Sequence, residues 1–434
     1  MIKIYTIFLN QIHYNCHCKN KPMLKHFFLL VIALFSFNIL AQNNYTISGY
    51  VQDESSGENL IGVSVYDKQT YKGTASNQYG FYSLTLPQGD YVIIYSFIGY
   101  KSITKNITLD KNTRLNVSLT SDAIIKEEVI VTGERLDKNV SSSNMSQAKI
   151  EVNNIKQLPV ILGEVDIMKA AQLLPGIQSG GEGNSGLYVR GGGPDQNLIL
   201  LDEAVVYNAA HLFGFFSVFN ADAIKDINII KGGMPAEYGG RLSSVLDISM
   251  KDGNNKKYEV DGGIGLLSSR LTIQGPVQKE KSSFIVSGRR TYIDVLSKPF
   301  MSKDSPFNGS GYYFYDLTTK INYRISDKDR LYLSGYFGRD VFNFGNTDNG
   351  IAIEIPWGNA TTSLRWNHLF NDKLFMNTSL IFSDYRFEFN IAQSEFELKI
   401  FSGINDWNTK VDFLYQPNQR HTIKFGSNYT YHEF

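Results

Sequence analysis

Apolar and polar residues alternate along most of this chain with the two-residue period of β-strands. The alternation is clearest at Leu317 and Ile321, which stand against Asp316 and Lys320, and it returns over residues 363–370. Because successive side chains of a strand point to opposite faces, each such strand has one apolar and one polar face. A soluble β-sandwich and a membrane β-barrel both fit this pattern.

The connections between these strands separate the two alternatives. Short turns and long connections are predicted to alternate: 277–282, 326–330, 371–373 and 417–420 are short, and 298–311, 343–356 and 390–405 are long. Outer-membrane barrels have short periplasmic turns and longer extracellular loops. Residues 257–434 therefore predict part of an antiparallel transmembrane β-barrel, with about nine strands.

The chain ends at Phe434, inside a strand pattern. Plugged outer-membrane transporters have about 22 strands. An open sheet edge in lipid would also leave backbone groups without hydrogen-bond partners. We therefore expect a truncated chain, from a shortened gene, a split reading frame or an incomplete sequence assembly.

Residues 1–41 are typical of a leader. A basic start after Met23 and an apolar run to about residue 40 precede the small residue Ala41, as in a secretory signal peptide. The run is too short to cross a bilayer as a helix. We expect translation to start at Met23, so that Cys16 and Cys18, the only cysteines, contribute no disulfide or metal site to the exported chain.

Residues 45–120 contain short alternating strands separated by turn residues such as Ser56-Gly57 and Tyr79-Gly80. This spacing predicts a small all-β sandwich. The string SGYVQDESSGENLIGVSVYDKQTYKGTASNQYGFYSLTLPQGDYVIIYSFIGY closely resembles the carboxypeptidase-regulatory-like domain. The resemblance implies an accessory sandwich that carries no catalytic zinc site.

Residues 158–251 combine one amphipathic helix with brief strands and glycine-rich turns. The helix is predicted over 163–174 and is followed by Pro175-Gly176, while strands are predicted over 187–190, 197–201 and 226–231. Three strings, YVRGGGPDQNLILLDEAVVYN, HLFGFFSVFN and KGGMPAEYGGRLSSVLDI, resemble the plug domain of TonB-dependent outer-membrane receptors. The sequence departs from the family at Glu203-Ala204, where the resemblance leads us to expect a glycine.

Two sets of plug residues follow from this resemblance. The plug motif comprises Arg190, Gly191, Gly192, Asp202, Gly232, Gly233, Tyr238, Gly239, Gly240 and Arg241. The candidate substrate loops carry Ser179, Glu182, Asn184, Tyr207, His211 and Phe213. For Arg190 and Arg241 we favour a structural role, in which each pairs with acidic residues inside a polar lumen.

Residues 121–157 form a polar linker with one apolar island. Its centre, Glu128, Val129, Ile130, Val131 and Thr132, resembles the TonB box of the same family. Such a segment works by lending an extended strand to the sheet edge of a partner. A stray edge strand is the alternative interpretation.

The predicted fold class is mainly β: an N-terminal β-sandwich, an α+β plug domain and the first part of an antiparallel transmembrane β-barrel. The resemblance implies uptake across the outer membrane of an iron-siderophore, cobalamin, a glycan or a peptide. The N-terminal domains would lie in the periplasm. The implied partners are a TonB-type energy-transducing protein, outer-membrane lipid, a small or oligomeric ligand and a surface lipoprotein. A secreted or surface-exposed binding module without a pore is the alternative.

No pattern of an enzyme is present. Residues 181–186 match G-x-G-x-x-G, but a dinucleotide site needs a strand before this loop and a helix after it. Here a helix end precedes the loop and a strand follows it. The chain contains no G-x-S-x-G elbow or P-loop, and its 42 basic and 42 acidic residues argue against nucleic-acid binding. We expect no catalytic residue, metal or cofactor.

Overall fold

Three β-rich parts follow one another in the structure, and the mainly β fold class is confirmed. The computed structural model describes residues 43–122, 146–156, 164–181, 186–300, 309–345, 351–393 and 396–434. The predicted leader and most of the predicted linker lie outside these residues. Everything described below belongs to one structural unit, residues 45–434.

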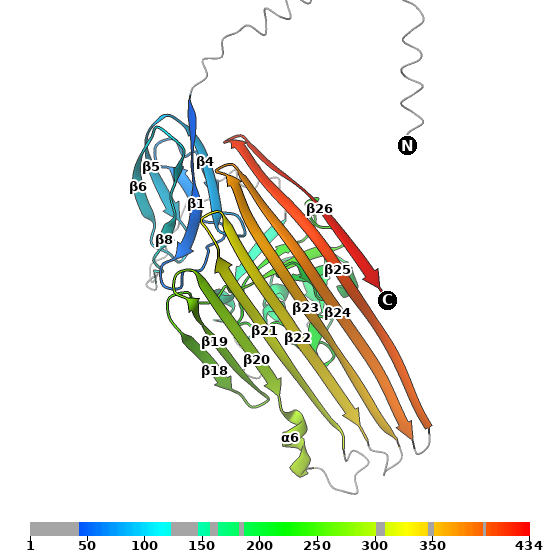
Figure 1. Ribbon diagram of the computed structural model, residues 1–434. Coiled ribbons are helices and arrows are strands. Elements are labelled where there is room, and N and C mark those ends of the chain that lie inside the picture. Colours follow the sequence, from blue (N-terminus) through cyan, green and yellow to red (C-terminus); the bar gives the residue numbers. More distant parts are fainter. Residues whose placement is uncertain are drawn as a thin grey trace, which may run out of the picture. The chain divides into compact units, whose positions relative to one another are not determined.

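The first part is a sandwich of two four-stranded sheets (Figure 1). One sheet has the order β4-β1-β7, with β8 also paired to β1, and the other has the order β3-β2-β5-β6. The strands are β1 (Asn44–Asp53), β2 (Ser64–Asp67), β3 (Gly73–Ala75), β4 (Phe81–Pro87), β5 (Gly89–Ser96), β6 (Ile103–Leu109), β7 (Thr113–Arg114) and β8 (Val117–Leu119). Its core is apolar and enclosed, with Ile47, Val65, Leu86 and Ile93 buried between the sheets.

The second part is built on a five-stranded sheet of order β13-β12-β17-β16-β9. Its elements are β9 (Gln147–Glu151), α4 (Val152–Ile155), α5 (Ile167–Gln172), β10 (Ile177–Ser179), β11 (Leu187–Val189), η1 (Pro194–Gln196), β12 (Asn197–Leu201), β13 (Ala204–Val205), β14 (Ala210–His211), η2 (Leu212–Gly214), β15 (Phe216–Ser217), β16 (Ile224–Ile230) and β17 (Ser244–Met250). An apolar cluster joins its helices to this sheet.

Helix α5 is shorter than the predicted helix over 163–174. It starts after Asp166, whose side chain accepts hydrogen bonds from the backbone N–H groups of Met168 (2.8 Å) and Lys169 (3.1 Å). An acidic side chain at this position satisfies the free N–H groups of the first turn. The helix ends at Gln172 because Pro175 disfavours helical backbone in the residue before it.

The third part is a sheet of nine antiparallel strands in sequence order, from β18 to β26 (Figure 1). The strands are β18 (Glu259–Ile264), β19 (Ser268–Gln278), β20 (Ser282–Thr291), β21 (Gly311–Arg324), β22 (Asp329–Phe344), β23 (Ala352–Asn371), β24 (Leu374–Gln393), β25 (Phe396–Asn418) and β26 (His421–Glu433). Helices α6 (Ile293–Ser297) and η3 (Lys298–Phe300) follow β20. Within the described residues β18 and β26 do not pair with each other, so the sheet is open.

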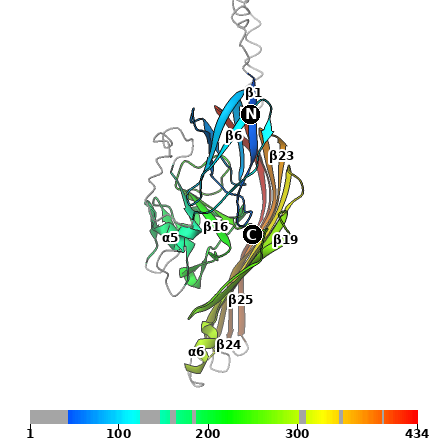
Figure 2. The ribbon, with the colours of Figure 1, turned by 90° about the vertical axis from the view of Figure 1, so that its left-hand side faces the viewer.

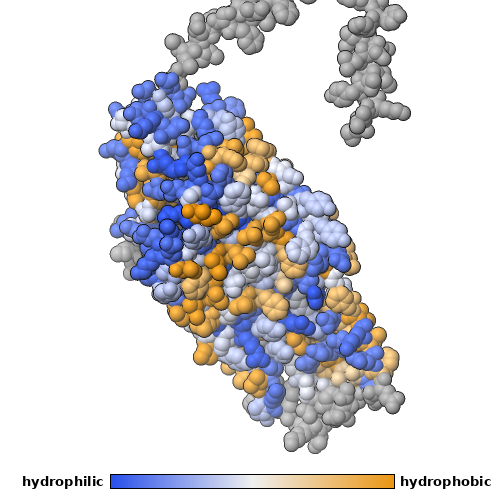
Figure 3. Space-filling model, viewed as in Figure 1, coloured by the Kyte–Doolittle hydropathy of each residue, from blue (hydrophilic) through white to orange (hydrophobic). Residues whose placement is uncertain are grey.

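The polar face of this sheet is buried and the apolar face is exposed. Leu317 and Ile321 are 44% and 48% exposed, whereas their neighbours Asp316 and Lys320 are each 3% exposed. Many hydrophobic side chains lie on the face that Figure 3 presents. A soluble sandwich would bury the apolar face, whereas a barrel in lipid exposes it.

Two of the predicted long connections are wrong. Strands β23 and β24 extend into them, so that residues 345–351 and 394–395 alone separate β22 from β23 and β24 from β25. Strand β24 has 20 residues and β25 has 23, far more than the roughly 9–11 that cross a bilayer. Backbone pairing continues through both stretches, up to Phe344 with Ile353 and Gln393 with Phe396.

The second part lies against the polar face of the large sheet (Figure 2). Tyr336 of β22 belongs to the apolar cluster of the second part, and Asn220 donates a hydrogen bond of 2.8 Å to Ser287 of β20. No helix in the described part of the chain has the length and hydropathy needed to cross a membrane.

Candidate functional site

A tight turn at Asp202 and Glu203 links β12 to β13. Both residues have positive φ, 46° and 75°. Two-residue hairpin loops of this kind need positive φ at both positions and favour glycine at the second. Glu203 therefore occupies the place where the family resemblance predicts glycine, and strained backbone of this kind is often kept for a functional contact.

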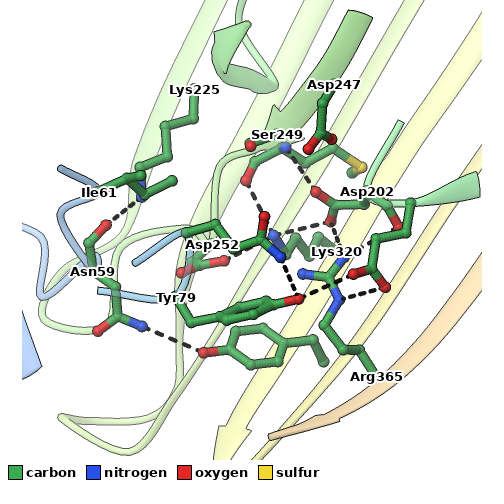
Figure 4. Close-up of a pocket in the computed structure, with 14 residues that line it drawn as sticks. Asn59, Ile61, Tyr79, Asp202, Lys225, Asp247, Ser249, Asp252, Lys320 and Arg365 are labelled. Atoms are coloured by element: carbon green, nitrogen blue, oxygen red, sulfur yellow. Dashed lines mark hydrogen bonds and ion pairs between the residues drawn. The ribbon is translucent and has the colours of Figure 1, made fainter. Parts of the chain in front are cut away.

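A buried ion cluster surrounds this turn. The ammonium of Lys320 lies 2.9 Å from Asp202 and 2.8 Å from Asp252. The guanidinium of Arg365 lies 3.5 Å from Glu203 and donates a 3.1 Å hydrogen bond to the carbonyl oxygen of Asp202. Figure 4 shows these side chains converging from the second part and from β21 and β23. Because buried charges are costly unless paired, the cluster fixes the turn against the sheet.

Glu203 also accepts three neutral hydrogen bonds. Tyr79 of the sandwich and Asn377 of β24 each donate over 3.0 Å, and the hydroxyl of Ser379 donates a third. Burial alone would raise the pKa of Glu203, but Arg365 and Lys410 lower it below its ordinary value. Glu203 is therefore a carboxylate at which all three parts of the chain meet.

The cavity at this junction is small and polar. Its volume is about 40 Å³, and Asp202, Glu203, Lys320, Arg365, Lys225 and Asp247 line it. Burial raises the pKa of Asp247 to about 6, although the hydroxyl of Tyr238 donates to its carboxyl group over 3.0 Å. A cavity of this size holds roughly one to three water molecules. We therefore interpret the junction as a joint between the three parts and not as a substrate pocket.

Tyr207 and His211, two candidate substrate-loop residues, contact the large sheet at some distance from this joint. The Tyr207 hydroxyl donates to Asp406 of β25, and its backbone N–H donates to Asn359 of β23 over 3.2 Å. Asn359 lies six residues before Arg365 along β23, which corresponds to roughly 20 Å. The hairpin that starts at the joint therefore continues well along the sheet.

His211 lies at the centre of a second charged cluster. Its imidazole nitrogens lie 2.7 Å from Asp340 and 3.3 Å from Asp316, and its ring stacks on Phe314 at 4.0 Å. Burial lowers the pKa of His211, but Asp340 and Asp316 raise it further, so that the net pKa lies above the ordinary value. His211 thus holds the loop to β21 and β22 through Asp316 and Asp340.

The other candidate loop residues are placed as follows. Ser179 is exposed at the end of β10, and the backbone of Phe213 lies in η2. Glu182, Asn184 and residues 128–132 lie outside the described residues. Tyr207 and His211 therefore both contact the large sheet, at different residues, whereas Ser179 is exposed.

The two motif arginines have partners other than those predicted. Arg190 donates to the hydroxyl of Ser146 over 2.8 Å, and Arg241 lies 5.9 Å from the ring centroid of Tyr207. Among the described residues, neither forms an ion pair with an acidic side chain. The expected pairing with lumen carboxylates is therefore not seen among the described residues. Asp202 and Glu203 pair instead with Lys320 and Arg365.

The motif glycines lie in turns around the five-stranded sheet. Gly191, Gly232, Gly233 and Gly240 have φ of 87°, 139°, 61° and 80°. A Cβ on Gly192 would lie 2.3 Å from the hydroxyl of Ser243, so only glycine fits there without a shift. Around Gly239 the same atom would meet open space.

The sequence did not predict the contacts that four residues make at the joint. These residues are Tyr79, Glu203, Lys320 and Arg365. A usable signal existed for two of them, since Lys320 and Arg365 are charges at polar-face positions of strands with exposed apolar faces. Among the described residues, no group of three or more His, Cys, Asp or Glu is arranged to hold a metal ion.

Two family models match the chain. The CarboxypepD_reg-like domain matches residues 47–131, and the TonB-dependent receptor plug domain matches residues 134–244. A TonB-dependent receptor of Formosa agariphila is 26% identical over 377 residues, which are 78% of this chain and 36% of that protein. The TonB-dependent receptor SusC of Bacteroides thetaiotaomicron is 29% identical over 55% of this chain and 24% of its own length.

One solved structure with a similar fold is the siderophore receptor PirA of Acinetobacter baumannii. Its identity is 15% and its TM-score 0.47, over 70% of this chain and 49% of that protein. In each of these comparisons the match spans well under two thirds of the relative's length.

Proposed function

We propose that the chain, which matches the TonB-dependent receptor plug domain over residues 134–244, is part of such a receptor and acts in energy-coupled uptake across the outer membrane. The observation that carries this proposal is the nine-stranded sheet, which exposes its apolar face and buries its polar face against the plug, the reverse of a soluble sheet. Lipid stabilises such a sheet from outside, while the plug fills its polar side. We further propose that the sandwich and the short turns face the periplasm.

The ligand would bind on the opposite side, near the loop that carries Tyr207 and His211. This loop contacts Tyr312 and Asp340, which lie at the ends of β21 and β22 away from the short turn between these strands. As ligand classes we propose an iron-siderophore, cobalamin, a glycan or a peptide. The receptor makes and breaks no covalent bond in this scheme; it binds the ligand and opens a path when the plug rearranges.

We propose that residues 128–132 form the strand on which the energy-transducing protein pulls. A strand added to the sheet edge of a partner is held by main-chain hydrogen bonds, and proline removes one of the donors. Val131→Pro should therefore weaken binding of the periplasmic domain of a TonB-type protein by about tenfold or more. Calorimetry with the full chain in detergent measures this.

Ser142→Pro is the matched control, because it places proline in the polar flank of the same linker. Equal binding by both variants and the unchanged chain would contradict the assignment of residues 128–132. It would leave the outer-membrane location untouched.

Cell fractionation tests the location itself. We expect the chain to partition with outer membranes and to migrate differently on gels before and after heating, as folded outer-membrane barrels do. A soluble, heat-insensitive product would favour the alternative of a secreted binding module and would overturn the proposed uptake function.

A further inference from the structure

A short apolar row interrupts the buried polar face of the nine-stranded sheet. Along β23 the inward positions are polar at Ser363, Arg365 and Asn367, and the next inward residue is Leu369. Leu369 is the register partner of Phe375 on β24, which is in turn the partner of Leu414 on β25. These three residues, the rim row, cross three strands beside the short turns.

A polar lumen gives no reason for apolar residues at these positions. Leu369 is 0% and Phe375 2% exposed, so the rim row is covered. The cover consists of three aromatic residues of the sandwich, which form one cluster with it: Tyr50, Tyr79 and Phe81. Buried aromatic side chains contribute much of the stability of protein interfaces.

The rings of this interface are closely packed. Tyr79 and Phe81 both stack on Phe375, with centroid distances of 5.3 Å and 5.6 Å. The guanidinium of Arg330 on β22 lies 3.6 Å from the ring centroid of Tyr50. The rim row and the three sandwich aromatics therefore complement each other in shape and in polarity.

Polar contacts surround the aromatic cluster. Asp372, in the turn between β23 and β24, accepts a 2.8 Å hydrogen bond from Ser48 and lies 3.2 Å from Arg114. Its carbonyl oxygen accepts a 2.6 Å hydrogen bond from Ser83. On the other side, Arg330 donates to the side chain of Asn59 over 2.7 Å.

The sandwich also contacts the plug. The Tyr79 ring stacks on the rim row, while its hydroxyl donates to Glu203 in the strained turn. Lys225 of β16 also lies 3.3 Å from Glu58 of the sandwich. The sandwich therefore holds the sheet and the plug turn at the same time.

We propose that the sandwich is an internal latch, docked on the rim row, which holds the plug in its closed position through the Tyr79–Glu203 contact. A plug turn that leaves the joint must break this contact, so undocking of the sandwich and movement of the plug favour each other. Such coupling is reciprocal. The docking stands independently of the proposed uptake function, whereas its consequence for opening rests on that function.

Cross-linking of the full chain tests the docking. The chain has two cysteines, Cys16 and Cys18, so their replacement by serine gives a cysteine-free background. Ser48→Cys with Asp372→Cys then places two thiols across the interface and leaves the aromatic cluster intact. Because Ser48 is buried and its hydroxyl lies 2.8 Å from Asp372, mild oxidation should link the two thiols readily as a disulfide, as seen by peptide mass spectrometry without reduction. The control pair is Ile98→Cys with Asp372→Cys, because Ile98 is 76% exposed on the sandwich.

Two further substitutions separate latching from mere proximity. Phe375→Ser should slow linking of the first pair by about tenfold or more, because it removes the ring on which the sandwich packs. Tyr79→Phe keeps the ring and loses the bond to Glu203, and should slow linking by about fivefold. The heat-dependent gel shift of each variant confirms that the sheet is folded.

Equal linking of the two cysteine pairs would overturn the proposal, as would unchanged linking in a folded Phe375→Ser variant. Both results are independent of membrane partition and of TonB binding. If linking behaves as expected but the chain does not bind the TonB-type domain, the latch stands and the proposed uptake function falls.

Discussion

The sandwich and the nine-stranded sheet use the same two-residue alternation in opposite ways. In the sandwich Ile47 and Leu86 point inward and are fully buried. In the large sheet the inward positions carry Asp316 and Lys320, and Leu317 points outward. Each arrangement suits its surroundings, because water stabilises an enclosed apolar core and lipid stabilises an exposed apolar face.

The difference teaches that stability is specified differently in the two parts. The sandwich is held by burial of apolar area. The polar side of the large sheet is held by paired charges and hydrogen bonds, where the loss of one partner is costly. The rim row is the exception, since there the sheet takes on the apolar character of the sandwich that covers it.

Lys320→Met should give the largest effect. In an apolar core a methionine would be tolerated, but here it leaves Asp202 and Asp252 without their cation. Breaking a buried ion cluster in this way costs about 3–5 kcal/mol. Urea unfolding of the chain folded in detergent measures the loss. The triple variant K320M/D202N/D252N should recover most of it, and a triple variant as unstable as the single one would refute the view of a charge-held lumen.

Leu380→Arg should come next. Leu380 is 52% exposed on the outward face of β24, and arginine near the middle of a bilayer costs about 2–4 kcal/mol. Folding into lipid vesicles, followed by urea titration, measures this. Ile98→Arg is the matched change at an exposed position of the sandwich, where we expect less than about 0.5 kcal/mol. Equal effects of the two substitutions would mean that water covers both surfaces.

A smaller effect concerns pH. The folded pKa of His211 is raised above its ordinary value of 6.5, so its stabilising contribution is complete below pH 6.5 and is lost as pH rises through the folded pKa. Asp340, Asp316, Arg289 and Tyr312 surround the histidine cluster. We expect the stability of the plug and sheet to fall as the pH rises above 6.5.

His211→Gln should flatten this fall. Asp247, whose pKa is raised to about 6, also loses stability as the pH rises, so the fall that remains in His211→Gln is assigned to Asp247. The sandwich contains no histidine and should keep its stability over the same range, as its near-ultraviolet circular dichroism would report. If the stability of His211→Gln varied with pH as that of the unchanged chain does, His211 would not be the cause of the fall.

The alternation predicted which residues share a face, and the predicted connection lengths, not the alternation, indicated that the apolar face is the outer one. Alternation places Asp316 and Lys320 together whether the sheet lies in lipid or in a soluble protein. The long connections predicted at 343–356 and 390–405 were wrong for a related reason. Backbone pairing continues through both stretches, up to Phe344 with Ile353 and Gln393 with Phe396, and side-chain alternation does not reveal it.

The joint was largely beyond sequence reasoning because its members are far apart in the chain. Tyr79 and Glu203 are separated by 124 residues, and Asp202 and Arg365 by 163. Tyr79 stands in a predicted turn, where no local pattern marks it as a contact residue. Leu369 offered a weak signal, since it breaks a run of polar inward positions.

The short turn at residues 371–373 has a practical consequence for engineering. Asn371 closes this turn through hydrogen bonds from the backbone N–H groups of Lys373 (2.9 Å) and Leu374 (3.1 Å), and Asp372 presents its contacts to the sandwich from there. An epitope tag inserted at Asp372 would separate these contacts and release the sandwich. A tag inserted after Asp327, in the turn that Ser326 and Asp329 close between themselves, should leave it in place.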